Sequence, residues 1–298
     1  MLLTNKIILI SLITCTLLGI ANTVCAKIKT DEIKKEQITD FNHINITNEL
    51  TKDLKGLKAF IEINRPKAIY LEQWITAEPH NKKLLKKLSK IAKKHNIKFY
   101  LVIGKNTWFG NRGVSNTLAS YEVYEKYIDG IVLRVEPNKV NVWKDDLSIK
   151  AQILNQMLDA YSGIYQETKK REKQFLVEFP FWFSDFKGPK ASFSEDACKY
   201  SDKISFLIDD IDQLDLLDDL DIQWNDITCR YNINLTKRAI NQNEEGINKI
   251  YKRLKAKLPM YSNFNGFIID SDSTLLEYKK DNQLSNENLG KDITGLTP

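Results

Sequence analysis

Short apolar segments and longer amphipathic stretches alternate along the chain from residue 43 onward. The short segments are rich in β-branched and aromatic residues and are bounded by turn residues, as buried strands are. Eight segments fit this description: 43–47, 67–75, 97–104, 129–137, 174–182, 203–210, 227–234 and 265–272. Between them, apolar residues recur three and four positions apart, which predicts helices. These stretches are 50–63, 80–95, 116–127, 148–171 and 236–257.

Strands that alternate with helices predict a parallel sheet covered by helices, the α/β class. Eight such units in about 230 residues favour a single-domain (β/α)8 barrel of the TIM type over two smaller domains. A doubly wound open sheet is the alternative, but the chain contains no G-x-G-x-x-G or G-x-x-x-x-G-K phosphate loop. We therefore expect one barrel over residues 41–278.

The first 26 residues are typical of a secretory signal peptide. Lys6 precedes a 14-residue apolar run, and small residues stand at the recognition positions before a cleavage point after Ala26. The run is short for a membrane span, although an uncleaved anchor is the alternative. We expect a signal peptide at 1–26, a lead segment at 27–40 and a flexible polar tail at 279–298. The mature protein would be secreted or periplasmic, with no stable membrane span after cleavage.

Composition narrows the range of chemistries. Without residues 1–26 the chain keeps 43 basic and 39 acidic residues, spread evenly, so no nucleic-acid surface is indicated. None of the three histidines lies in a ligand-spaced motif, which disfavours a His-built zinc site and a Ser-His-Asp hydrolase. No cofactor and no metal are expected, and a monomer is the default. Cys198 and Cys229 either pair, as an exported protein allows, or one of them is simply buried.

Polar residues of the predicted strands fall on one face. Successive side chains of a strand point to opposite faces, and the other face of these strands is apolar and suited to helix contact. The polar residues lie toward the carboxyl ends of their strands, where barrel enzymes place their active sites. A buried Arg134 needs a carboxylate partner, and Glu136 and Glu178 are the natural ones. The face carries Tyr70, Glu72, Trp74, Arg134, Glu136, Glu178, Ser205, Asp209, Arg230, Asn232, Asn234, Asp270 and Asp272.

The segment "DGIVLRVE" resembles the D-G-x-D-x-D-x-E strand-four signature of chitinase-like family 18 glycoside hydrolases. Asp129, Gly130 and Glu136 stand in register with it, and the resemblance implies that Glu136 is the general acid that protonates the leaving glycosidic oxygen. Val132 and Arg134 replace the two intervening aspartates. The second of those aspartates orients the substrate's acetamido group in the family, so the resemblance does not extend to that mechanism or to chitin.

Glycoside cleavage needs a carboxylic acid and a second carboxylate that acts as nucleophile or base. We predict Glu136 as the acid and Glu178 or Asp209 as the second carboxylate, with Arg134 as an orienting cation. Tryptophans at strand ends make platforms for sugar rings, and we predict that Trp74 and Trp182 line the site. Further substrate-binding candidates are Glu72, Arg230, Asn232 and Asp270.

Two other functions stay open. Loss of the two signature aspartates fits a non-catalytic barrel, a pseudoenzyme that binds a glycan or a protein. A divalent-ion phosphodiesterase would instead recruit Glu72, Glu136 and Asp209 as oxygen ligands. The acidic stretch 209–221 has seven aspartates but lacks the glycine and closing glutamate of an EF-hand loop, which favours a solvated face.

Overall fold

The computed structural model describes residues 43–46, 54–73, 79–143, 146–186, 192–210, 212–213, 227–236, 238–239 and 263–271. All of these belong to the compact unit Asn42–Pro298. The predicted signal peptide, lead segment and polar tail lie outside the described residues, as does most of the helix expected at 236–257.

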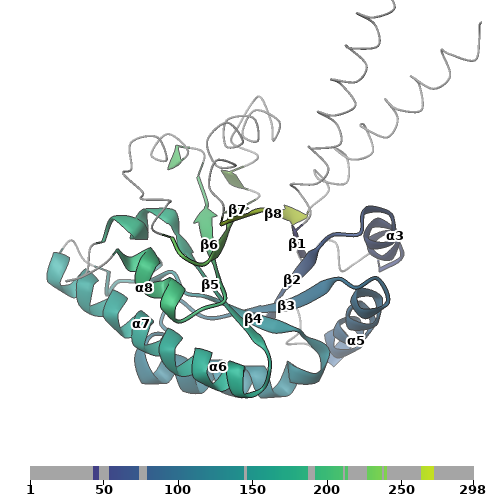
Figure 1. Ribbon diagram of the computed structural model, residues 1–298, viewed down its shortest axis with the longest axis horizontal. Helices are drawn as coiled ribbons and strands as arrows, with labels where there is room; N and C mark the ends of the chain where they lie inside the picture. Colours follow the sequence, from purple (N-terminus) through teal and green to yellow (C-terminus); the bar gives the residue numbers. More distant parts are fainter. Residues whose placement is uncertain are drawn as a thin grey trace, which may run out of the picture. The chain divides into compact units, whose positions relative to one another are not determined.

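Eight parallel strands form a closed barrel in which each strand pairs with its neighbours in sequence and β1 pairs with β8 (Figure 1). This confirms the predicted (β/α)8 fold, and every expected strand is present. The strands are β1 (His43–Ile46), β2 (Ala68–Glu72), β3 (Lys98–Ile103), β4 (Gly130–Arg134), β5 (Gln174–Pro180), β6 (Lys203–Ile208), β7 (Arg230–Leu235) and β8 (Phe264–Ser271).

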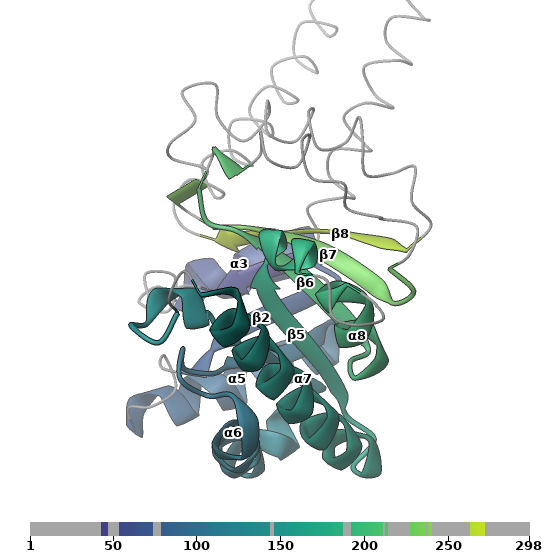
Figure 2. The same cartoon turned by 90° about the vertical axis from the view of Figure 1, so that its left-hand side faces the viewer.

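Helices lie outside the strands, and in Figure 2 the long helix α7 runs alongside β5. The α-helices are α3 (Leu54–Asn64), α5 (Pro79–Lys94), α6 (Gly110–Tyr124), α7 (Leu147–Lys170) and α8 (Phe193–Lys199). Three short 3-10 helices are η1 (Glu125–Tyr127), η2 (Pro137–Lys139) and η3 (Phe181–Asp185). The sequence pattern did not predict α8, whose seven residues span only two turns.

Helix α6 begins six residues earlier than its apolar spacing predicted. Its first turns contain Gly110 and Gly113, which interrupt the apolar pattern. A Cβ atom on Gly113 would lie 2.6 Å from the carbonyl oxygen of Trp108. Glycine is therefore required for the close approach of this helix to the segment that precedes it.

The two faces of the strands form two separate packing regions. Inward-facing apolar residues make one cluster in the barrel interior: Ala68, Tyr70, Tyr100, Val102, Val132, Leu176 and Ile268. Alternate residues such as Ile69, Leu101 and Leu133 are fully buried on the other face. Because both faces are covered, the strands exclude water along most of their length. Buried polar side chains such as Glu178 and Asn232 therefore form hydrogen bonds to other side chains of the interior.

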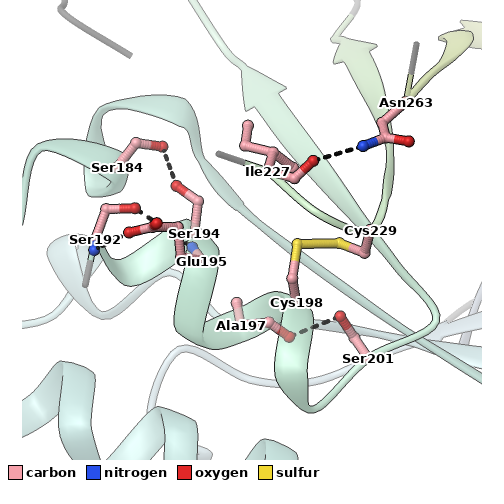
Figure 3. Close-up of a disulfide and its surroundings, with 10 residues drawn as sticks. All are labelled: Ser184, Ser192, Ser194, Glu195, Ala197, Cys198, Ser201, Ile227, Cys229 and Asn263. Atoms are coloured by element: carbon pink, nitrogen blue, oxygen red, sulfur yellow. Dashed lines mark hydrogen bonds between the residues drawn. A yellow bond between two sulfur atoms is a disulfide. The ribbon is translucent and has the colours of Figure 1, made fainter. Parts of the chain in front are cut away.

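Cys198 and Cys229 form a disulfide, with Cα atoms 5.3 Å apart (Figure 3). It links the last turn of α8 to the residue before β7. Hydrogen bonds fix both flanks: Ser201 Oγ donates to the Ala197 oxygen at 2.8 Å, and Asn263 Nδ2 donates to the Ile227 oxygen at 2.8 Å. The sequence left this pairing open, and the structure decides it in favour of the bridge.

Among the described residues, no helix is long and apolar enough to span a membrane.

The disulfide closes a loop over a sequence separation of 31 residues, so its removal should destabilise the fold. A Cys198→Ala/Cys229→Ala variant of the chain from Lys27 should unfold about 10 °C lower, because a loop of this length corresponds to roughly 3–4 kcal/mol of chain entropy. Thermal unfolding followed by circular dichroism measures this. Reductant should lower the melting temperature of the wild type and leave the variant unchanged; equal melting temperatures would refute the bridge.

Candidate functional site

The inward faces of β2, β4 and β5 carry a charged network at the carboxyl ends of the strands. Arg134 Nη1 donates to Glu72 Oε1 at 2.7 Å, and Arg134 Nε donates to Glu178 Oε1. Asn234 Nδ2 of β7 donates to the other carboxylate oxygen of Glu178 at 2.7 Å. Only 1% of the Glu178 side chain is exposed, against 20% for Arg134 and 22% for Glu72. One guanidinium thus links three strands.

Arg134 therefore has Glu178 as its partner, which was one of the two partners expected, and Glu72 as a second. Glu136 is not a partner of Arg134. It lies two residues beyond the end of β4, where η2 begins, and its Oε2 contacts Lys139 Nζ at 2.7 Å. Glu136 thus contacts Lys139 across one helical turn, instead of pairing with Arg134 along the face of the strand as expected.

Lys139 also contacts a second acid. Its Nζ lies 3.2 Å from Oδ2 of Asp209, which directly follows β6. The two contact distances together limit the separation of the Glu136 and Asp209 oxygens to 5.9 Å. The side chains of Asp209 and Lys139 are 30% and 43% exposed, whereas that of Glu136 is 10% exposed. We call Glu136, Lys139 and Asp209 the carboxylate–lysine triad.

Neighbouring strand ends hold the triad in place. Thr236, which follows β7, donates its Oγ1 proton to Asp209 Oδ1 at 3.2 Å. The Asp209 amide donates to Gln213 Oε1 at 2.9 Å, and the Glu136 amide donates to Asn106 Oδ1 at 3.3 Å.

Burial alone lowers the pKa of Lys139, but its hydrogen bonds with Glu136 and Asp209 outweigh that effect and raise the pKa above its ordinary value. Lys139 therefore carries its charge at neutral pH.

A cavity of about 450 Å³ opens at the carboxyl ends of β2, β3 and β4. This volume lies within the range of small-molecule sites, about 300–1,000 Å³. Asn106 belongs both to its wall and to the hydrogen bond with the Glu136 amide. The wall is formed by Glu72, Gln73, Val102, Ile103, Gly104, Lys105, Asn106, Trp108, Ser120 and Arg134.

A second polar network lies deeper in the barrel. Tyr70 Oη lies 3.4 Å from His43 Nδ1, and Asn265 Nδ2 lies 3.4 Å from His43 Nε2. Asn265 also donates to Asn232 Oδ1 at 2.8 Å. Burial, with smaller contributions from Lys203 and Lys67, lowers the pKa of His43 to about 3. His43 is therefore neutral at physiological pH.

Not every predicted residue reaches the carboxyl ends. Arg230 is the first residue of β7 and is exposed at the opposite end of the barrel, and Asn232 is fully buried in the deeper network. Trp182 does lie at the carboxyl end of its strand, in η3 directly after β5, where it packs against Trp143 and Phe183 with ring centroids 6.0 and 4.5 Å apart. Trp74 and the side chain of Asp270 lie outside the described residues.

Two parts of the site were missed in the sequence. Lys139 was readable as the third residue after Glu136, a spacing that brings side chains together across a helical turn. Lys105, Asn106 and Trp108 follow Gly104 at the end of β3, and their position after a predicted strand is the signal that could have found them. In the part of the chain that the structure describes, no three His, Cys, Asp or Glu side chains gather as a metal site would require, so Glu72, Glu136 and Asp209 do not form one.

Known proteins resemble this chain only distantly. No family model and no curated protein matches the chain. A D-tagatose 3-epimerase-like protein aligns with 84% of this chain and 99% of its own, at 14% identity and a TM-score of 0.48. A sugar phosphate isomerase/epimerase from Parabacteroides distasonis aligns over 78% and 89%, at 10% identity and 0.44. The C-terminal domain of a protein assigned as a chitinase, from Desulfitobacterium hafniense, aligns over 57% of each chain, at 13% identity and 0.39.

Replacement of Arg134 should leave the carboxylate of Glu178 buried without a counter-charge. We expect Arg134→Met to lower the free energy of unfolding by about 3–5 kcal/mol. The double variant Arg134→Met/Glu178→Gln should recover part of that loss, because it removes the uncompensated charge. Urea denaturation of the four members of the cycle measures the coupling.

The matched control is Arg238→Met, which removes an exposed arginine that pairs with Asp210 at 2.9 Å. It should change the stability little. Additive effects of the Arg134 and Glu178 substitutions would contradict the buried ion pair.

His43 should make the stability depend on pH. Its pKa is about 3 in the folded chain and about 6.5 when unfolded, so the unfolded state takes up the proton first as the pH falls. The stabilisation is complete above pH 6.5 and declines toward pH 3. As the pH is lowered from 7.5 to 5, protonation of His43 in the unfolded state should reduce the free energy of unfolding by about 2 kcal/mol.

A His43→Gln variant should lose less stability than the wild type over that interval, as chemical denaturation at each pH would show. His95→Gln serves as the control for loss of an imidazole elsewhere. Parallel stability curves for wild type and His43→Gln would rule out a buried neutral His43.

Proposed function

We propose that this barrel is an exported glycoside hydrolase-like protein that acts on a polysaccharide or glycan. The carboxylate–lysine triad carries the proposal, because Glu136 and Asp209 contact the same Lys139 nitrogen at the carboxyl ends of β4 and β6. Barrel enzymes assemble their active sites from the loops at this end. Glycoside cleavage requires a pair of carboxyl groups that flank the scissile bond, and two acids from different strands at this short separation meet that requirement.

Glu136 acts as the acid that protonates the leaving oxygen, and Asp209 acts as the second carboxylate. Retaining enzymes hold their carboxyl groups about 5–5.5 Å apart and inverting enzymes about 6.5–9.5 Å apart. The upper limit of 5.9 Å between the two contacting oxygens fits the retaining class better. Asp209 is the more exposed of the two and is thus the more open to a sugar carbon.

Glu178 has a different role from the one first assigned to it. Arg134 and Asn234 occupy its two carboxylate oxygens, and its side chain is almost fully buried. It therefore serves as a positioning residue that fixes Arg134 in the wall of the cavity. Glu72 and Arg134 in turn present a rigid polar surface to a bound sugar.

The disulfide supports export. Disulfides persist in oxidising compartments and are rare in the cytosol. Together with the signal sequence expected at residues 1–26, the bridge between Cys198 and Cys229 favours a secreted or periplasmic protein. A glycan outside the cytoplasm is then the natural substrate.

A non-catalytic glycan-binding barrel is the second candidate, and one observation favours it. Lys139 engages both Glu136 and Asp209, and Arg134 engages Glu178, so each of the three predicted catalytic acids is in an ion pair. A general acid must carry a proton when the glycosidic bond breaks. In the hydrolase, a bound sugar would have to displace Lys139, whose side chain is 43% exposed and able to move.

The Glu136→Gln variant separates the two candidates. Release of reducing ends from a glycan panel should fall by about 10²–10⁴-fold, because the amide cannot donate the proton, while binding measured by calorimetry is kept. Glu122→Gln on the outer face of α6, where the glutamate side chain is 60% exposed, is the matched control and should keep full activity. Glycan binding by the wild type without cleavage of any panel member would establish the non-catalytic barrel.

A further inference from the structure

Residues 104–108, which we call the cavity turn, form a rigid part of the cavity wall. The amide of Trp108 donates to the carbonyl oxygen of Lys105 at 2.8 Å, which closes the turn. Gly104 adopts φ +140°, and a Cβ there would lie 2.1 Å from the Arg134 oxygen. The close contact of Gly113 with the Trp108 oxygen packs α6 against the turn. The backbone at Lys105 and Trp108, two residues of the cavity wall, is therefore held in place before any ligand arrives.

Charge in the cavity is unevenly compensated. The guanidinium of Arg134 is more than neutralised, because it pairs with two carboxylates, that of Glu72 at 2.7 Å and that of Glu178. Lys105 lines the same cavity and forms no ion pair with any carboxylate among the described residues. Arg134 is thus paired within the wall, whereas Lys105 can pair with a ligand in the cavity.

We propose, building on the sugar site proposed above, that the cavity binds an acidic sugar. The ring stacks on the indole of Trp108, and a negatively charged substituent of the ring pairs with Lys105. Lys105 is exposed, so it keeps water or sugar hydroxyls as acceptors when a neutral sugar binds. A carboxylate or sulfate on the ligand instead forms a charge-assisted hydrogen bond with the ammonium, which is roughly twice as strong as a neutral one.

The remaining groups of the wall suit the rest of such a ligand. Val102 and Ile103 extend the apolar surface beside Trp108, as the C–H face of a pyranose requires. Side-chain amides of Gln73 and Asn106 lie on the same wall and can bond ring hydroxyls. Because the Asn106 side chain also accepts from the Glu136 amide, a sugar held here lies next to the proposed acid.

The test uses acidic glycans and their matched neutral forms. Oligosaccharides of polygalacturonate, alginate and hyaluronan are each compared with the carboxyl-reduced counterpart, and those of κ-carrageenan with the desulfated, neutral form. Calorimetry and tryptophan fluorescence give the affinities. At least one acidic member should bind about tenfold more tightly than its neutral partner, because one charge-assisted bond is lost on reduction. The pair that shows the preference identifies the substituent as carboxylate or sulfate.

Variants assign the effect to the two side chains. Lys105→Gln should reduce the affinity for the acidic sugar to that of the neutral form and leave neutral binding unchanged. Trp108→Ala should weaken both by about tenfold, since it removes the stacking surface. Lys86→Gln, an exposed lysine of α5, is the control and should have no effect.

The outcomes separate this inference from the proposed function. Equal affinity for acidic and neutral partners would refute the acidic ligand while leaving the sugar site in place. Acidic-sugar binding that depends on Lys105, without cleavage that depends on Glu136, would uphold the inference and refute the hydrolase. Absence of binding to every member of the panel would refute both.

Discussion

The guanidinium of Arg134 is the interaction on which the interior of this barrel depends. A charge below the rim of a packed barrel is tolerated only when it is compensated at hydrogen-bond distance, and two carboxylates and an amide provide that compensation across β2, β4, β5 and β7. Each participant fixes the next, because Arg134 and Asn234 donate the hydrogen bonds that the buried carboxylate of Glu178 needs. These four side chains thus form a single connected unit, distinct from the deeper network around His43.

This unit divides the carboxyl end of the barrel into two regions with different properties. Glu72, Arg134 and Glu178 satisfy one another and form a fixed wall. The carboxylate–lysine triad lies nearer solvent and is joined by a flexible lysine side chain. A site that binds and then reacts needs both, since positioning requires rigid groups and proton transfer requires groups that can change partner.

The fold was predictable because its signals are local and repeated. Alternation along a strand places side chains on one face or the other, and this assigned Glu72, Arg134 and Glu178 correctly to the interior. Alternation does not give the height of a residue in the barrel, so Arg230 was grouped with the carboxyl ends although it starts its strand. Partners depend on which strands are neighbours and on their register, so the pairing of Arg134 with Glu72, 62 residues away, could not be read from the chain.

The cavity turn connects the two regions, and this determines how binding and chemistry would be coupled. Gly104 brings the end of β3 into contact with the backbone of Arg134, and two residues later Asn106 accepts a hydrogen bond from the Glu136 amide. A ligand that contacts Lys105 or Trp108 therefore contacts a segment that has two attachments. Gly104 packs against the Arg134 backbone, and Asn106 accepts a hydrogen bond from the Glu136 amide. Proton transfer by Glu136 would then require that Lys139 leave its acids, whereas Glu72, Arg134 and Glu178 are already held by one another.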